Sequence, residues 1–332
     1  MTAATGIGSM PGDDAAAVAE ATRTVLDSLP DLPHLVELPG RGATASMTGR
    51  GLAVLAELGA DLQPAGWRLT GGGAGVDHRR ARSLLAQDLD VLEEQAQGLS
   101  GSFKIQVAGP WTLAATVERP RGDKLLADAG ARRELAQALA EGVRDHVRDV
   151  RRRLPDDTRL VVQVDEPALA AVLDARVPTA SGFGRHRTVH PPEASDALGW
   201  VLGAATEAGG EAWVHTCAAG TPLGLLRGAG ARGLAVDLSL MTAADHDALG
   251  EALEAGDSVV LGVVPTTAAA GPEAGEKALV ERVERWLDML GIDPGTVSGQ
   301  LLVSPACGLA GADVAWSRRA LALSSDTARR LS

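Results

Sequence analysis

The chain has 332 residues with a formal net charge of −12 at pH 7, and aromatic residues make up only 2% of it. This acidic balance argues against non-specific nucleic-acid binding, which needs clustered lysine and arginine. No apolar run reaches the roughly 18 residues of a membrane-spanning helix, and the N-terminus lacks the pattern of a signal peptide. We therefore expect a cytoplasmic protein with no nucleic-acid or membrane partner, whose core is filled by Ala, Val and Leu.

Short aliphatic runs alternate with longer helix-forming runs along the chain. The eight expected strands are residues 5–10, 34–38, 103–108, 160–165, 212–217, 233–238, 259–264 and 301–304. Several are apolar on both faces, as is typical of buried parallel strands. Eight strands with intervening helices favour an α/β fold, a single (β/α)8 TIM barrel, over the alternative of an open doubly wound sheet.

Between these strands, apolar residues recur at the three- and four-residue spacing of helices. The clearest expected helices are residues 13–29, 78–96, 132–154, 243–255 and 276–290. Two segments interrupt the alternation. Residues 65–76 are rich in glycine and are expected to form a hairpin or an irregular excursion, and residues 175–192 are expected to form a long exposed loop. Neither marks a domain boundary, so we expect residues 1–332 to form one domain.

The C-terminal ends of the strands are where a β/α barrel places its chemistry. Both cysteines of the chain, Cys217 and Cys307, fall at such ends, and so does His215. His215 and Cys217 are two positions apart, so an extended strand directs both side chains to one face. Zn²⁺ prefers such nitrogen and sulfur ligands, and Asp237, ending the next strand, can add an oxygen. The alternative is that the cysteines are small buried hydrophobic residues and His215 a hydrogen-bonded core residue.

Adjacent carboxylates, Asp165 and Glu166, lie at the end of the fourth expected strand. An extended chain directs them to opposite sides, so we expect only one, Asp165, to enter the site and bind a substrate ammonium group. The alternative is that Asp165 caps the helix that follows, with Pro167 near its first turn. Glu37 ends the second expected strand and can bind substrate or pair with Arg41.

The first expected strand contains the segment Ile7-Gly8-Ser9, whose backbone amides and hydroxyl can bind a carboxylate or simply form a tight corner. The motifs IGSMP, GPWTL, VVQVDEPAL, VHTC and LVSPACGL then occur in this order along the chain. This arrangement resembles the C-terminal catalytic barrel of cobalamin-independent methionine synthase. The resemblance extends from Gly6 to about Arg319, and its most specific pieces are DEPAL and the H-x-C and CGL motifs.

This resemblance implies a metal, a substrate and the residues that hold them. The zinc ligands that it implies are His215, Cys217, Cys307 and, where the family has a glutamate, Asp237. The homocysteine-binding residues that it implies are Ile7, Gly8, Ser9, Glu37 and Asp165. The residues expected to carry catalysis are Asp165, His215, Cys217 and Cys307.

Three features depart from the family. Full-length members carry an N-terminal barrel, whereas we expect a stand-alone catalytic core with no folate-binding-type N-terminal barrel. The family's proton-donating histidine follows the seventh strand, but residues 259–271 contain none; His186 and His190 are candidates to replace it, although exposed loop positions are favoured for both. The helix after GPWTL lacks the family's folate-contacting tryptophan. The methyl donor is therefore left open as a methylated folate or a methylcorrinoid protein.

Together these features predict a zinc-dependent methyltransferase that converts homocysteine to methionine. A free alkyl thiol has a pKa of about 8.5, whereas zinc coordination deprotonates it at neutral pH. One alternative is a zinc-dependent alkyltransferase acting on another small thiol. Another is a non-enzymatic redox or regulatory barrel in which Cys217 and Cys307 form a thiol pair. A metal-free decarboxylase of the uroporphyrinogen barrel type is a third, against which the H-x-C and CGL motifs argue.

Overall fold

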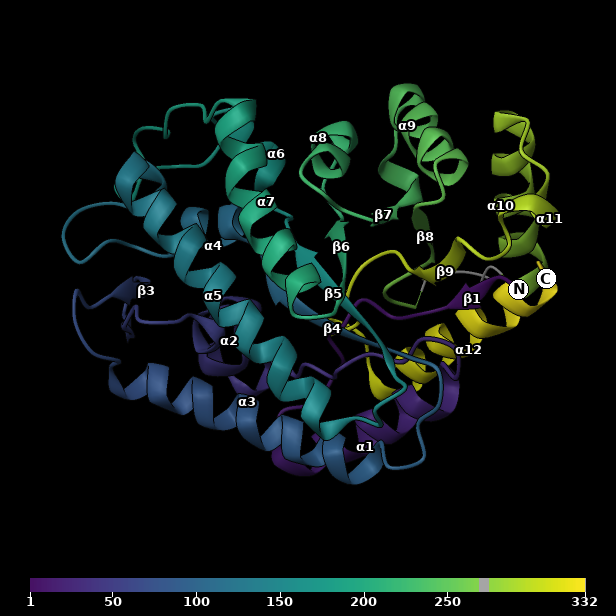
Figure 1. The fold of residues 1–332 in the computed structure, drawn as a ribbon, viewed down its shortest axis with the longest axis horizontal. Coiled ribbons are helices and arrows are strands. Elements are labelled where there is room, and N and C mark those ends of the chain that lie inside the picture. The colour runs from purple at the N-terminus through teal and green to yellow at the C-terminus, as the bar shows by residue number, and fades with distance from the viewer. Residues whose placement is uncertain (269–274, 332) are drawn as a thin grey trace.

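The computed structural model describes residues 1–268 and 275–331. Its centre is a seven-stranded sheet in the order β1-β9-β8-β7-β6-β5-β4, in which all neighbouring strands are parallel (Figure 1). The strands are β1 (Ala3–Ala4), β4 (Ser102–Ala108), β5 (Arg159–Asp165), β6 (Glu211–Thr216), β7 (Gly233–Asp237), β8 (Ser258–Val264) and β9 (Leu301–Pro305). The expected α/β fold with a parallel sheet is thus confirmed.

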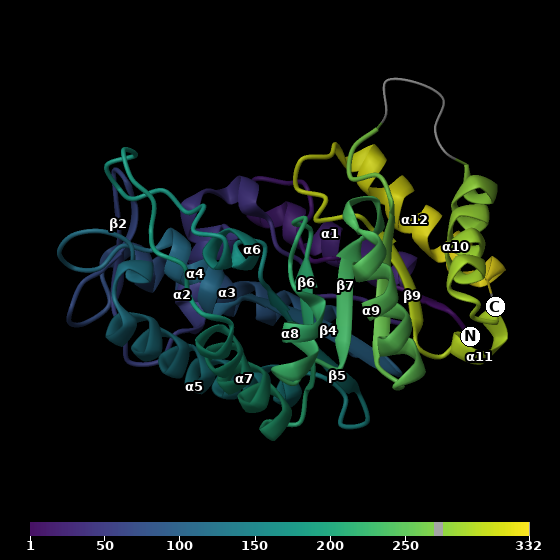
Figure 2. The same ribbon diagram turned by 90° about the horizontal axis from the view of Figure 1, so that it is seen from above.

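Helices cover the outer face of this curved sheet. They are α1 (Ala15–Ser28), α2 (Met47–Val54), α3 (Val76–Gln95), α4 (Pro110–Thr116), α5 (Ala129–Arg153), α6 (Leu169–Leu173), α7 (Pro191–Glu207), α8 (Leu223–Gly228), α9 (Ala243–Glu254), α10 (Glu276–Leu290), α11 (Pro294–Val297) and α12 (Val314–Arg330). Each of the helices α1, α3, α5, α7, α8, α9, α10 and α12 contacts the next, and α12 contacts α1, so the outer helices form a ring (Figures 1 and 2). None of the helices in the described part of the chain is long and apolar enough to cross a membrane.

The second expected strand, residues 34–38, does not form a regular strand. It makes two isolated parallel bridges, one between His34 and Lys104 of β4 and one between Glu37 and Ser9. The Leu35 N–H donates to the Lys104 carbonyl at 2.8 Å, and the Glu37 N–H donates to the Gly8 carbonyl at 3.1 Å. The segment therefore lies between the two edges of the sheet.

Prolines and a glycine explain why these two edges are irregular. Pro33 and Pro39 flank the second expected strand, and proline has no N–H to extend a ladder. The first expected strand, residues 5–10, is also not regular: β1 covers Ala3–Ala4, just before it, and Gly8 adopts a φ of +150°, which breaks the extended path. Of the eight expected strands, six are therefore confirmed, and the first two are not regular strands.

Most expected helices and the hairpin are confirmed with shifted ends. Helix α10 has the expected bounds, and α1 begins after Asp14, whose side chain accepts from the Ala17 N–H at 2.8 Å. The glycine-rich segment completes an antiparallel hairpin of β2 (Ala60–Gln63) and β3 (Gly66–Leu69), which starts earlier than expected because residues 60–63 supply its first strand.

Inside the sheet, an apolar layer lies beneath a polar one. Successive strands contribute Leu302, Val260, Ala235, Trp213 and Val161 to a small buried cluster that also includes Leu32. Two positions further along the same strands stand Ser304, Gly262, Asp237, His215 and Gln163. Because side chains two apart share a face, the C-terminal end of the sheet interior is lined by the polar set.

Candidate metal and substrate site

A cavity of about 340 Å³ lies at the C-terminal ends of the strands. It is lined by Ile7, Gly8, Ser9, Glu37, Pro39, Met47, Gln106, Asp165, Pro167, His215, Cys217, Cys307 and Gly308. The structure therefore brings the five residues expected to bind substrate together with the histidine and both cysteines. Residues from the first and last strands meet here, since Ser9 and Gly308 lie against each other and the Leu309 N–H donates to the Ser9 carbonyl.

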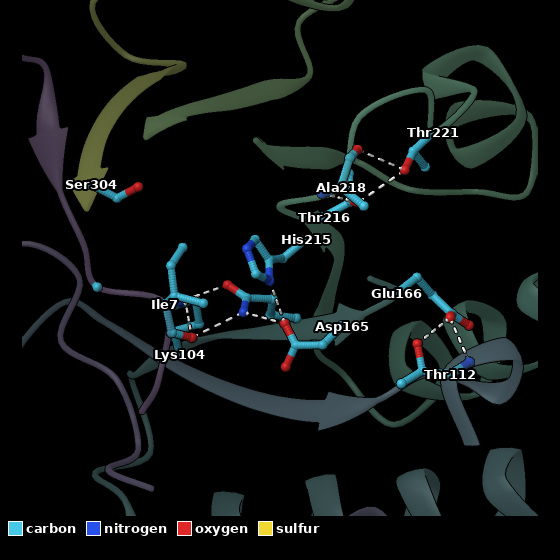
Figure 3. A network of polar contacts seen from close by, with 12 residues as sticks. Ile7, Lys104, Thr112, Asp165, Glu166, His215, Thr216, Ala218, Thr221 and Ser304 are labelled. Atoms are coloured by element: carbon cyan, nitrogen blue, oxygen red, sulfur yellow. Dashed lines mark hydrogen bonds and ion pairs between the residues drawn. The ribbon is translucent and has the colours of Figure 1, made fainter. Parts of the chain in front are cut away.

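Three side chains form a group that can hold a metal ion. One ligand atom from each of His215, Cys217 and Cys307 lies within 4.8 Å of the others. The Nδ1 of His215 is 2.8 Å from Oδ1 of Asp165 (Figure 3). Its buried Nε2 has no hydrogen-bond partner of ordinary geometry among the described residues, and His215 interacts with Cys307. A metal-binding histidine is held in this way, with one ring nitrogen on a carboxylate and the other free for the ion. The donor set thus fits a metal.

Both cysteines are free thiols, and the pair shares a proton unequally. The hydrogen bond from the Cys217 thiol is the largest influence on Cys307; with the help of His215 it outweighs burial and lowers the pKa of Cys307 to about 5. The same hydrogen bond, together with burial, raises the pKa of Cys217. The surroundings thus favour ionisation of Cys307 over Cys217, and the thiolate is the form in which cysteine binds metals.

Asp237, the fourth expected ligand, ends β7 with its carboxylate engaged elsewhere. Its Oδ1 accepts hydrogen bonds from the Ser239 N–H at 2.9 Å and the Ser239 hydroxyl at 2.6 Å. It caps the short turn Leu238–Leu240 and is not part of the group of closely spaced ligand atoms. Its charge nevertheless adds to the larger effects of Cys307 and burial that raise the pKa of Cys217.

The two adjacent acids at the end of β5 face opposite ways (Figure 3). Asp165 lines the cavity, and its Oδ1 accepts from Gln163 Nε2 as well as contacting His215. Glu166 is fully buried on the other side and accepts from the backbone N–H groups of Trp111 and Thr112, each at 2.8 Å, and from the Thr112 hydroxyl. The alternative that Asp165 caps the following helix is wrong, because α6 has Ala168 at its N-cap and no side-chain hydrogen bond there. Glu166 instead accepts from the first turn of α4, whose N-cap residue makes no side-chain hydrogen bond.

Glu37 pairs with Arg50 and not with Arg41. Its Oε1 is 3.3 Å from Arg50 Nε, and Arg50 Nη1 is 2.5 Å from Asp88. Arg41 instead binds both oxygens of Asp88. Burial raises the pKa of Glu37, and Arg50 opposes this shift. Sequence reasoning missed Arg50 and Asp88 because they lie on α2 and α3, where no spacing ties them to a strand end.

A buried lysine lies beneath the cavity. Lys104 Nζ donates to the Ile7 carbonyl and to Gln163 Oε1, and Gln163 Nε2 donates to Ile7 and to Asp165 (Figure 3). Burial lowers the pKa of Lys104 to about 7, although Asp165 and Glu37 oppose the shift. This chain connects the Ile7 carbonyl to the carboxylate that positions His215. Lys104 was not expected from the sequence, where it lies within a largely apolar run and not at a strand end.

The loop histidines do not line the cavity in the described structure. His190 is exposed, as expected, but His186 is buried and its Nε2 is 3.2 Å from Asp123. The expectation of an exposed position is wrong for His186, because a bridge between Pro178 and Arg185 folds the loop back. Of the histidine-free segment 259–271, residues 269–271 lie outside the described residues.

Comparison with known proteins identifies the family of the chain. Residues 102–330 match the family described as cobalamin-independent synthase, catalytic domain. A B12-independent methionine synthase from Shewanella sp. W3-18-1, solved in complex with selenomethionine, superposes with a TM-score of 0.64 at 14% identity, covering 100% of this chain and 98% of that one. A methyltransferase from Methanosarcina mazei gives a TM-score of 0.59 at 13% identity, covering 96% and 87%. No curated protein matches the sequence. The chain belongs to the family of cobalamin-independent synthase catalytic domains, and it is a methyltransferase.

Proposed function

We propose that the protein transfers a methyl group to the thiol of homocysteine and forms methionine, with Zn²⁺ held by His215, Cys217 and Cys307. The observation that carries the proposal is the close approach of three donor side chains: one ligand atom from each of His215, Cys217 and Cys307 lies within 4.8 Å of the others. Zn²⁺ favours this mixture of nitrogen and sulfur donors. Asp237 is proposed as a fourth ligand, which requires its carboxylate to move toward the other three, because it is not part of their closely spaced group. When bound, zinc would coordinate the substrate thiol and keep it deprotonated.

The remaining residues of the cavity would hold the amino-acid part of homocysteine. Its volume of about 340 Å³ suits a small ligand. Ile7, Gly8 and Ser9 are proposed to face the substrate carboxylate, and Glu37 and Asp165 its ammonium group. Selenomethionine, bound in the Shewanella relative, has the carbon skeleton of methionine, which supports an amino acid of this size.

We also propose a closed barrel fold and a cytoplasmic location. Residues 34–37 are proposed to act as the eighth strand of a closed (β/α)8 barrel, because they bond to both edges of the sheet and the outer helices form a ring. Residues 1–332 would then form one catalytic domain. Two free thiols fit a reducing cytoplasmic setting. The donor is proposed to be a methylated folate or a methylcorrinoid protein.

The test is zinc content of the purified protein, followed by X-ray absorption at the zinc edge during titration with homocysteine. We expect about one zinc per chain and one additional sulfur neighbour at saturation. A metal-free protein with a disulfide between Cys217 and Cys307 would overturn the proposal in favour of a redox or regulatory role. Zinc that gains sulfur from another small thiol but not from homocysteine would instead favour a different alkyltransferase.

A further inference from the structure

A glutamine on the wall of the cavity has its amide nitrogen in a hydrogen bond and its amide oxygen without one among the described residues. Gln106, on β4, is 5% exposed and lines the cavity. Its Nε2 donates to the Leu35 carbonyl at 2.7 Å, whereas its Oε1 is buried without a partner among the described residues. Because a carbonyl oxygen can only accept, the amide atom 2.7 Å from it is the nitrogen, and the other amide atom is the oxygen. A buried acceptor without a partner is unfavourable unless a ligand supplies the donor.

The backbone opposite Gln106 is shaped to bring this amide close. A Cβ atom added at Gly8 would lie 2.7 Å from Cδ of Gln106, and the φ of +150° at Gly8 is one that side-chain-bearing residues rarely adopt. The Gly8 carbonyl also accepts from the Glu37 N–H. Gly8 thus packs the amide of Gln106 beside Glu37 at the cavity wall.

The three acceptors in this region match one ammonium group. We infer that Oε1 of Gln106 binds the ammonium group of the substrate amino acid as its third acceptor, beside the carboxylates of Glu37 and Asp165; this rests on the proposed function. Asp165 uses Oδ1 for Gln163 and His215, which leaves Oδ2 for a ligand. Gln106 also forms a hydrogen bond that favours the ionised form of Glu37. An ammonium group has three N–H donors, and when buried each needs an acceptor.

The charges around Gln106 exclude the carboxylate of the substrate amino acid from this position. A substrate carboxylate here would face two carboxylates and an amide oxygen, and all of these are acceptors. Gln106 is therefore a determinant of specificity for α-amino acids over thiols that lack the amino group.

The test measures binding to the zinc-loaded enzyme by calorimetry, with L-methionine and with 4-(methylsulfanyl)butanoate, which lacks only the amino group. Gln106→Met removes the acceptor and keeps a similar volume. We expect this variant to lower the affinity for L-methionine about tenfold or more, and the affinity for the desamino compound by less than about twofold. The matched control is Met47→Leu, an apolar change in the same cavity, which should affect both ligands alike.

The inference is overturned if Gln106→Met lowers the affinity for both ligands equally, or if it lowers neither affinity. A measurement on the unaltered enzyme covers the case in which the variant does not fold: N-methyl-L-methionine has one N–H fewer, so it should bind about tenfold more weakly than L-methionine. Equal affinity for the two would show that one N–H needs no acceptor and would also overturn the inference. If the unaltered zinc enzyme binds the desamino compound as well as L-methionine, the inference on Gln106 fails while thiol alkylation stands. If neither homocysteine nor methionine binds, the proposed function itself fails.

Discussion

The two sides of the cavity are built on different principles. On the metal side, His215, Cys217 and Cys307 come from strand ends, and Nε2 of His215 has no hydrogen-bond partner of ordinary geometry among the described residues. On the acid side, Glu37 is paired with Arg50, which is itself paired with Asp88, and all three are buried. The metal side thus has donor atoms for the proposed ion, whereas the charges of the acid side are already paired with one another. Substitutions on the metal side should therefore act mainly on function, and substitutions on the acid side mainly on stability.

The largest expected effect is on the metal side. Cys307→Ala removes the sulfur whose thiolate form is stabilised by Cys217 and His215. We expect zinc content and methyl transfer to be lost together, with little change in the free energy of unfolding of the metal-free chain, because Cys307 is only partly buried. Metal analysis and turnover on the same preparation check this. Turnover by a zinc-free variant would contradict the proposed mechanism.

The acid side should respond in the opposite way. Arg50→Met leaves the buried carboxylate of Glu37 without its cation, and breaking a buried pair costs about 3–5 kcal/mol of unfolding free energy. The control is Arg148→Met, whose side chain is 56% exposed and lies beside Asp145, 65% exposed; loss of this surface pair should cost less than about 1 kcal/mol. Urea unfolding of both variants measures the difference. Equal losses would show that Glu37 is not dependent on Arg50.

The adjacent acids at the end of β5 allow a test of the metal side with a control at the neighbouring position. Asp165→Asn keeps an acceptor near His215 but removes the charge, and loss of such a supporting carboxylate typically weakens metal binding about 10- to 100-fold. Glu166→Gln is the matched control, because Glu166 faces α4 and should leave zinc affinity unchanged. Competition with a chelator measures both affinities. An equal loss in the two variants would place the effect in the strand and not in the carboxylate.

The sequence predicted the metal side better than the acid side for a physical reason. The two-residue period of a strand places His215 and Cys217 on one face and sends Asp165 and Glu166 to opposite faces. The pairing of Glu37 with Arg50 depends instead on how α2 and α3 are rotated against the sheet, which no strand period fixes. The same holds for His186, whose burial depends on the path of a loop. The first and second expected strands were overestimated because apolar character alone does not register the break at Gly8 in the first or the effect of Pro33 and Pro39 on the second.

The smallest expected effect concerns Lys104, which lies beneath both sides. Its pKa is about 7 in the folded protein, against an ordinary value of 10.5. Between these values the unfolded chain binds a proton that the folded chain does not, so stability should rise with pH and the penalty should be fully present below about pH 7. The slope contributed by this group is at most about 1.4 kcal/mol per pH unit.

Lys104→Met removes this slope while other titrating groups stay common to both proteins. Urea unfolding at about pH 8 and about pH 10 should therefore show the unaltered protein gaining stability relative to the variant as the pH rises. Parallel pH profiles would mean that Lys104 keeps its proton in the folded state, held by the Ile7 carbonyl, Gln163 and the charges of Asp165 and Glu37. In that case a protonated Lys104 would add to Arg50 a second positive charge that stabilises the carboxylates of the acid side. The difference between the two sides of the cavity would then be larger than a neutral Lys104 implies.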